Sequence, residues 1–392
     1  MNTGDYAVII AILIYFMVVL IIGFSYARRA NKSSSEYFLG GRKVGPWFTA
    51  LSAEASDMSG YLLMGLPGLA YFTGAADAGW TCIGLALGTY FNWLLVAKRL
   101  RRYSEKANDS ITLPGFYSNR FHDDKNVVST VAAVIILIFF CVYTGSCFVT
   151  CGKLFNTLFG MDYTVMMIFG AIIVFLYTMV GGYLSVVATD FVQGCLMFFA
   201  LAVVVIGSIT MAGGIENTAA FLSDIPGYLS MVQTATPEVD ADGVQYLLGG
   251  APVFGIPAEY GLLTIISTLS WGLGYFGMPQ VLVRFMGIRN DSEIKTSRRI
   301  AIVWVVISMF CAIMIGIIGR YLFPAQYLTQ SGAESIFIFL SQVMLPGFLC
   351  GLVVSGILAA SMSSASSYLL ITGSSVAENI FRGVFKKNAT DN

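Results

Sequence analysis

Charged residues and histidine are scarce in this sequence of 392 residues. Only 11% of the residues are Asp, Glu, Lys or Arg, whereas soluble domains average about 25%. The single histidine, His122, lies among charged loop residues, so we expect neither a haem with axial histidines nor a multi-histidine zinc or copper site. The seven cysteines include no Cys-x-x-Cys pair, and a net charge of zero gives no reason to expect a nucleic-acid partner.

Apolar residues fill the chain instead, at 57% of the total. About 20 apolar residues are enough for a helix to cross a lipid bilayer, and such stretches recur from end to end. The sequence therefore predicts an all-α polytopic membrane protein. Its nine expected spans are roughly 6–27, 46–72, 80–97, 127–152, 163–184, 191–212, 260–283, 300–319 and 346–377. The serines of these spans have no histidine or lysine base beside them, so no enzyme is expected.

The distribution of basic residues predicts the orientation. Twenty of the 22 lysines and arginines fall in four segments, 28–43, 98–125, 284–299 and 382–387, and only Lys153 and Arg320 fall between them on the other side. Basic loops stay in the cytoplasm, so we expect the N-terminus outside and the C-terminus in the cytoplasm. The tail 378–392 is then cytoplasmic. The loop 213–259 is external, either as a lid or as a passive linker, and Ser335–Leu345 is too short to span and is expected to be an interfacial helix.

The second span contains a charge near its centre. Asp57 is followed by Ser59 and Gly60, and then by Pro67 and Gly68. A carboxylate in a bilayer costs several kcal/mol and needs a compensating partner. A helix that unwinds at Gly and Ser frees backbone carbonyls, which must line a cavity or bind a cation. A cation site answers both needs, and the alternative is an aspartate bonded to a neighbouring helix that packs against the glycines.

The seventh span is interrupted in the same way. Between Ser270 and Gln280 it holds three glycines and Pro279. Two spans broken by Gly and Pro at corresponding positions indicate an inverted-repeat transporter. Trp271 and Tyr275 lie one turn apart on one face, where they could stack on a small organic solute or act as interfacial anchors.

Small residues dominate the ninth span between Ala359 and Ser367. Ser363 and Ser364 could supply oxygen ligands to a hard cation such as sodium. The alternative is close packing of small residues, with the serines bonded to their own preceding turn.

Three further polar residues lie in or beside the spans. Glu54 shares a helical face with Asp57, either as a second carboxylate of the site or, as we prefer, as a protonated group nearer the cytoplasmic end. Tyr143 in the fourth span could pack in the core or contact the solute, and the sequence favours neither alternative. Asp190 is expected to cap the N-terminus of the sixth span, with a role in ion exit as the alternative.

These segments resemble the sodium:solute symporter family, and within it the sodium/proline symporters. The matching strings are Leu51–Gly68, Gly181–Asp190, Trp271–Pro279 and Ile357–Ser366. The resemblance implies an inverted five-plus-five helix repeat with discontinuous helices, in which 6–27 is an extra span, 46–212 the first repeat and 260–377 part of the second. It also implies sodium as the coupling ion and proline as the solute. The implied sodium residues are Ala55, Met58, Ala360, Ser363, Ser364 and the essential Asp57; the implied solute residues are Ser59, Gly60, Tyr143, Trp271, Tyr275 and Pro279.

The chain also departs from the family pattern. Gln280 stands where proline symporters commonly carry histidine, Ser364 where they have threonine, Glu54 where they have a small residue, and Tyr61 where they have tryptophan. The family usually continues for several more spans, so we expect a C-terminally truncated member whose second repeat is incomplete. Proline is the expected solute; the alternatives are another amino acid, a carboxylate or a sugar, and a transport-inactive fragment or solute sensor.

Overall fold

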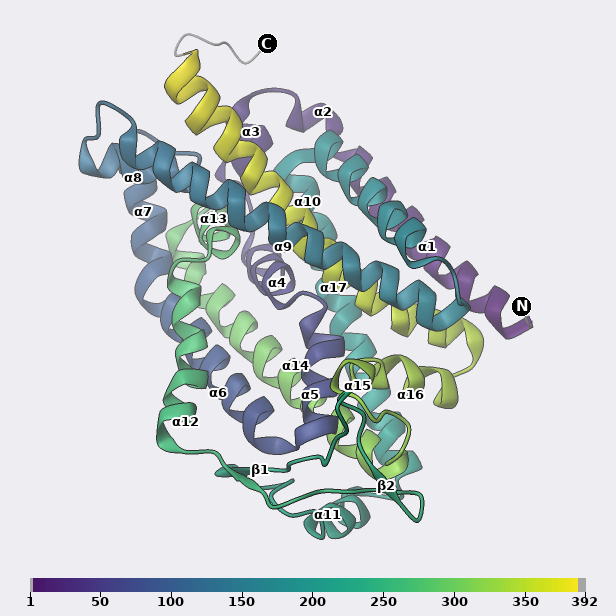
Figure 1. Cartoon of the computed structure of the whole chain (residues 1–392). Coiled ribbons are helices and arrows are strands. Elements are labelled where there is room, and N and C mark those ends of the chain that lie inside the picture. Colours follow the sequence, from purple (N-terminus) through teal and green to yellow (C-terminus); the bar gives the residue numbers. More distant parts are fainter. Residues whose placement is uncertain (1–2, 387–392) are drawn as a thin grey trace.

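Most of the protein is helical (Figure 1). A computed structural model describes residues 3–386. The first half contains α1 (Thr3–Ser25), α2 (Ala27–Ala30), α3 (Ser34–Leu39), η1 (Gly40–Arg42), α4 (Pro46–Met58), η2 (Tyr61–Gly65), α5 (Leu66–Thr73), α6 (Ala75–Asn92), η3 (Trp93–Ala97), α7 (Lys98–Lys106), α8 (Leu113–Phe121), α9 (Val127–Phe159) and α10 (Tyr163–Met211). The second half contains α11 (Ile215–Ser223), α12 (Leu262–Leu269), η4 (Ser270–Phe276), α13 (Pro279–Gly287), η5 (Asp291–Glu293), α14 (Ile294–Leu322), α15 (Gln330–Ala333), α16 (Ile336–Met344), α17 (Gly347–Ser374) and η6 (Ser375–Phe385).

Six helical segments of the described chain are long and apolar enough to cross a membrane. They contain α1, α6, α9, α10, α14 and α17. The predicted spans 163–184 and 191–212 both lie in α10, which bends sharply at Gly182 (φ 57°, ψ −155°). Only glycine adopts this conformation without strain, and Figure 1 shows two arms of α10 meeting at the bend. The predicted spans 46–72 and 260–283 are each divided into shorter helices.

The centre of the molecule is α17, which packs against α1, α9, α10 and α4. Every residue from Val353 to Tyr368 is buried, so the small residues of this span face protein rather than lipid, as expected. From the neighbouring α10, the hydroxyl of Tyr177 donates to the backbone carbonyl of Met362 (3.0 Å). The helix continues beyond 374 as η6, so residues 378–385 of the expected tail are helical, and residues 387–392 lie outside the described part.

The two predicted breaks are both present. Helix α4 ends at Met58, and Ser59 follows with φ 49° and ψ −168°, after which the chain re-enters a helix at η2. In the second broken segment α12 tightens into the 3-10 helix η4, and α13 starts at Pro279 after the extended residue Met278. A proline is favourable at a helix N-terminus because its missing N–H has no intrahelical partner there.

Close glycine contacts hold the second break against α6. A Cβ on Gly88 would lie 2.2 Å from the carbonyl oxygen of Gly272 and 2.5 Å from its Cα. Both are backbone atoms of η4, so they cannot rotate away. Backbone-to-backbone packing of this kind is available to helices only where small residues meet.

We therefore expect Gly88→Ala to destabilise the protein by about 1–3 kcal/mol, the usual cost of overpacking. A thermal melt of the purified protein in detergent measures this. Gly145→Ala in α9 is the matched control, because no atom lies within 4 Å of a Cβ there, and it should leave the melting temperature unchanged or slightly raised. Equal melting temperatures for the two variants would contradict the packing argument.

The four predicted basic segments meet at one end of the molecule. The guanidinium of Arg42 pairs with Asp109 (2.8 Å), and that of Arg102 pairs with Asp291. From η6, Arg382 donates to the hydroxyl of Ser34 (3.0 Å). We refer to this end as the basic face. One member of the predicted set is different: Arg284 is completely buried in α13, so its assignment to a loop is wrong.

The loop 213–259 is folded onto the opposite end (Figure 1). It contains α11 and the strands β1 (Gln233–Thr234), β2 (Leu247–Leu248), β3 (Ala251–Pro252) and β4 (Ala258–Glu259), where β1 pairs with β4 and β2 with β3 in antiparallel register. Buried Tyr228 donates to the carbonyls of Ala70 and Tyr71, and Gln245 accepts from Arg320 (2.8 Å). The loop is therefore attached to α5 and α14 by specific bonds. Ser335–Leu345 contains the predicted short helix, α16, although half of its residues are buried against other helices.

Candidate functional site

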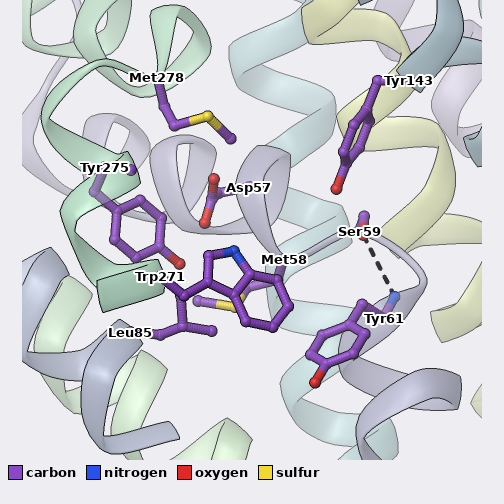
Figure 2. Close-up of a pocket in the computed structure, with 10 residues that line it drawn as sticks. Asp57, Met58, Ser59, Tyr61, Leu85, Tyr143, Trp271, Tyr275 and Met278 are labelled. Atoms are coloured by element: carbon purple, nitrogen blue, oxygen red, sulfur yellow. Dashed lines mark hydrogen bonds between the residues drawn. The ribbon is translucent and has the colours of Figure 1, made fainter. Parts of the chain in front are cut away.

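The two broken helices border one cavity of about 160 Å³. Its walls come from the end of α4, from α6, from α9 and from the second break (Figure 2). The lining residues are Asp57, Met58, Ser59, Tyr61, Leu85, Tyr143, Trp271, Gly274, Tyr275 and Met278. Six of these, at positions 57, 58, 59, 143, 271 and 275, were proposed from the sequence as ion or solute residues, and the fold brings them together from three separate segments.

Asp57 supplies the charged side chain in this lining. The amide of Gln280 donates to its Oδ1 at 3.3 Å, and Tyr275 lies beside the carboxylate in the lining (Figure 2). Both residues lie at the second break, so this carboxylate joins the two halves of the site. Neither residue is a cation, which leaves the charge of an ionised Asp57 available to a bound cation.

Aromatic rings form the rest of the wall. The Trp271 ring lies 5.4 Å from that of Tyr61, and Tyr143 makes an edge-to-face contact with Tyr368 at 4.7 Å. Ser59 lines the same wall, and its hydroxyl accepts from the backbone N–H of Tyr61 (3.4 Å). In Figure 2 the rings of Trp271, Tyr275 and Tyr143 stand around the carboxylate of Asp57. Rings placed in this way can hold a small organic solute by stacking and by cation–π contact with an ammonium group.

Two proposed solute residues do not line the cavity. Pro279 forms the first turn of α13 next to the lining residue Met278. Gly60 faces α9 and α17, where a Cβ would lie 2.8 Å from Thr150 and 3.2 Å from the hydroxyl of Ser361. Their positions suit backbone roles, in which Pro279 fixes the start of α13 and Gly60 permits close packing at the break.

Backbone and hydroxyl oxygens gather where α4 meets α17. The hydroxyl of Ser363 donates to the carbonyl of Ala55 (2.7 Å) and to that of Ala360 (3.1 Å), and the hydroxyl of Ser364 also donates to Ala360 (3.2 Å). All four residues are fully buried. Met58 ends α4 next to them, so its carbonyl belongs to the turn that lacks intrahelical donors. We refer to these five residues as the oxygen cluster.

The oxygen cluster fits a hard cation. Neutral carbonyl and hydroxyl oxygens are ligands of alkali and alkaline-earth ions, whereas zinc and copper prefer nitrogen and sulfur. Within residues 3–386 no group of three or more His, Cys, Asp or Glu side chains is placed to hold a metal. The serines do bond to their own preceding turn, as the packing alternative requires, but Ser363 also reaches across to α4.

Glu54 is separate from the cavity. Its Oε1 accepts from the indole N–H of Trp93 at 3.0 Å, and the side chain is buried. It is not among the residues that line the cavity, so its geometry favours the interpretation of a passenger group over that of a second carboxylate.

Asp190 is not a helix cap. It lies within the second arm of α10 and is completely buried. Its Oδ2 accepts from Arg284 (3.1 Å) and from Ser52 (2.6 Å). The guanidinium of Arg284 also donates to Ser52 and Ser367 and stacks over Tyr183, 5.0 Å from the ring centre. The cap interpretation is wrong because the second arm begins directly after the bend at Gly182 and not at residue 191, so Asp190 lies about two turns inside it.

Sequence reasoning missed several members of the site. Gln280 and Tyr61 were noticed only as departures from a family pattern, and Arg284 was counted as a loop residue. A usable signal for Arg284 exists, because it lies one turn after Gln280 on the same face of α13. Nothing in the sequence predicts that Leu85 lines the cavity, since it is one of several apolar residues of α6.

The chain matches known proteins along nearly its full length. The profile of the sodium:solute symporter family matches residues 37–392. The osmoregulated proline transporter OpuE of Bacillus subtilis (strain 168) is 40% identical over 386 residues, which cover 98% of this chain and 73% of OpuE. The sodium/proline symporter of Staphylococcus aureus (strain JH9) is 41% identical over 373 residues, which cover 95% of this chain and 68% of that protein.

A solved structure matches the fold. It is the substrate-bound outward-open state of a Na⁺-coupled sialic acid symporter, which superposes with a TM-score of 0.79 at 19% identity and covers 99% of this chain and 76% of that chain. The fold, the membrane-spanning helices and the family profile agree with the resemblance inferred from the sequence. The chain belongs to the sodium:solute symporter family and is a multi-pass membrane transporter rather than an enzyme.

Proposed function

We propose that this protein takes up proline across the plasma membrane by coupling it to sodium entry. The observation that carries the proposal is the juxtaposition of the oxygen cluster, the carboxylate of Asp57 and the aromatic cavity at the two helix breaks. Two relatives of about 40% identity are named as a proline transporter and a sodium/proline symporter, which supports the choice of solute and ion.

Sodium is assigned to the oxygen cluster. The carbonyls of Ala55, Met58 and Ala360 and the hydroxyls of Ser363 and Ser364 are the proposed ligands. Asp57 supplies negative charge from the adjacent cavity. Each sodium ion that enters gains about 2.3 kcal/mol per 100 mV of membrane potential, which could drive a roughly 50-fold solute gradient from that potential alone.

Proline is assigned to the cavity between Tyr143, Trp271 and Tyr275. The rings offer faces for the pyrrolidine ring and its ammonium group, and the hydroxyl of Ser59 offers a hydrogen bond. Gly60 and Pro279 act through the backbone conformation of the breaks. Asp57 favours a solute with a positive group, so a simple carboxylate or a neutral sugar fits this lining less well than an amino acid does.

Alternating access would use the two breaks as corresponding elements of an inverted repeat, 46–212 and 260–377. The basic face would lie in the cytoplasm by the positive-inside rule, with the N-terminus outside and the C-terminus inside. The loop 213–259 would then be external. On the cytoplasmic side of the oxygen cluster, Asp190 is the proposed exit residue for sodium, since Ser52 joins it directly to α4 and Arg284 joins it to Ser367 of α17.

The test is uptake of labelled proline into proteoliposomes with and without an inward sodium gradient. We expect accumulation only with the gradient, and competition by unlabelled proline but not by carboxylates or sugars. Equal uptake with and without the gradient would disprove coupling. Saturable proline binding without any uptake would instead identify a solute sensor, and competition by another solute would reassign the substrate.

A further inference from the structure

Two further hollows, apart from the cavity around Asp57, lie on the lipid-facing side of α4, α10 and α14. One, the basic cavity, has a volume of about 300 Å³ and lies at the basic face, where Tyr26, Arg29, Lys43 and Arg289 line it beside Phe48 and Leu184. The other, the apolar groove, has a volume of about 520 Å³ and is lined by Trp47, Leu51, Phe198, Val303 and Trp304, with Arg299 as its charged residue. Neither hollow shares a residue with the cavity around Asp57.

The two hollows follow one face of α10. Leu184, Val187 and Ala188 line the basic cavity, and Cys195 and Phe198 line the apolar groove further along the helix. Residues at these spacings lie on one side of an α-helix. Between them Phe191 stacks on Phe48 of α4, with ring centres 4.4 Å apart. The two hollows therefore lie along one face of α10, with the stacked rings of Phe48 and Phe191 between the charged hollow and the apolar one.

The basic cavity carries net positive charge. Arg29 and Lys43 share a single acid, Glu36, at 3.1 Å and 2.8 Å, and Arg289 pairs with Glu293. Three cations thus face two carboxylates. Arg299 adds an exposed guanidinium that has no ion pair within residues 3–386. An anion can reach these side chains at the surface of the protein, since those of Lys43 and Arg289 are 61% and 55% exposed.

We propose that these hollows form a binding site for one anionic glycerophospholipid. Its phosphate lies in the basic cavity with Arg29, Lys43 and Arg289, and its acyl chains lie in the apolar groove between Trp47 and Trp304. Basic pockets between membrane helices on the cytoplasmic side bind anionic head groups, and an indole at this depth suits the membrane interface. The ligand bridges α4, α10 and α14, and so couples lipid composition to the helix that carries Asp57.

Quenching of tryptophan fluorescence by brominated lipids tests the proposal, because two of the five tryptophans line the groove. The purified protein is reconstituted in phosphatidylcholine vesicles that contain a small fraction of phosphatidylglycerol or phosphatidylcholine with brominated acyl chains. We expect stronger quenching by the brominated phosphatidylglycerol, and loss of this difference when Trp47→Phe and Trp304→Phe are combined. Equal quenching by the two lipids would overturn the proposal.

A charge-matched pair of variants separates the site from general attraction to the surface. Arg29→Gln/Lys43→Gln/Arg289→Gln should lower the preference for phosphatidylglycerol by roughly 100-fold, since it removes three basic residues from the phosphate and each contributes about a factor of five. Arg99→Gln/Lys106→Gln/Lys295→Gln removes the same charge from exposed positions outside the hollows and should keep the preference. Equal loss in both variants would refute a specific site.

The first variant leaves Glu36 without its two basic partners and could unfold. The single change Lys43→Gln avoids this problem, because Glu36 keeps its ion pair with Arg29 and Lys43 is 61% exposed, and it should lower the preference by roughly fivefold. An unchanged preference in this folded variant, together with unchanged quenching of Trp47, would also refute the proposal.

Discussion

Asp57→Asn is expected to raise the sodium concentration that gives half-maximal proline uptake by roughly 30-fold or more. The substitution keeps the shape of the side chain and an oxygen that accepts from Gln280, but it removes the charge. Two unit charges about 6–8 Å apart at an effective dielectric constant of about 20 interact by ~2–3 kcal/mol, and 1.4 kcal/mol is a factor of ten. Initial rates of labelled proline uptake over a range of sodium concentrations measure the change.

Glu54→Gln is the matched control for this experiment. It changes the second carboxyl group of the same helix to an amide, and the amide oxygen can still accept from Trp93. Since Glu54 lies outside the cavity, its half-maximal sodium concentration should stay within about twofold of the original value. A shift in both variants would show that the effect is not specific to Asp57, and an unchanged sodium dependence for Asp57→Asn would remove that residue from the ion site.

The sequence was most informative where local chemistry alone decides the structure. The breaks at Ser59 and at Met278 could be predicted, because glycine, serine and proline weaken a helix wherever they occur together. The burial of the serine-rich stretch in α17 could also be predicted, since its hydroxyl groups would find few hydrogen-bond partners in lipid. In both cases the physical cause of the structure lies in a few consecutive residues.

Long-range pairing was not predictable in the same way. Nothing near Arg284 or Asp190 in the sequence says that they meet, because 94 residues separate them. The sharp bend at Gly182 has a local cause, yet a pair of adjacent glycines is compatible with either packing or bending. The enclosure of Asp57 by Gln280 and Tyr275 likewise depends on the packing of α13 against α4.

Arg284→Met is expected to destabilise the protein by about 3–5 kcal/mol, because it leaves Asp190 buried without a cation. Four helices meet at this pair: Ser52 comes from α4, Asp190 from α10, Arg284 from α13 and Ser367 from α17. Loss of the guanidinium therefore leaves one carboxylate and two hydroxyls short of a donor in a region with no exposed surface. Unfolding of the purified protein in detergent, followed by denaturant titration or a thermal melt, measures the loss.

Two comparisons give this result its meaning. Arg289→Met breaks an exposed pair with Glu293, one turn apart on the surface, and should cost no more than about 0.5 kcal/mol. The double variant Asp190→Leu/Arg284→Met removes both charges and should be more stable than Arg284→Met alone, because the cost comes from the unpaired charge and not from the missing contact. If the double variant were instead less stable than Arg284→Met by the full cost of Asp190→Leu alone, the two side chains would contribute to stability independently. An unpaired buried charge would then not be the cause of the loss.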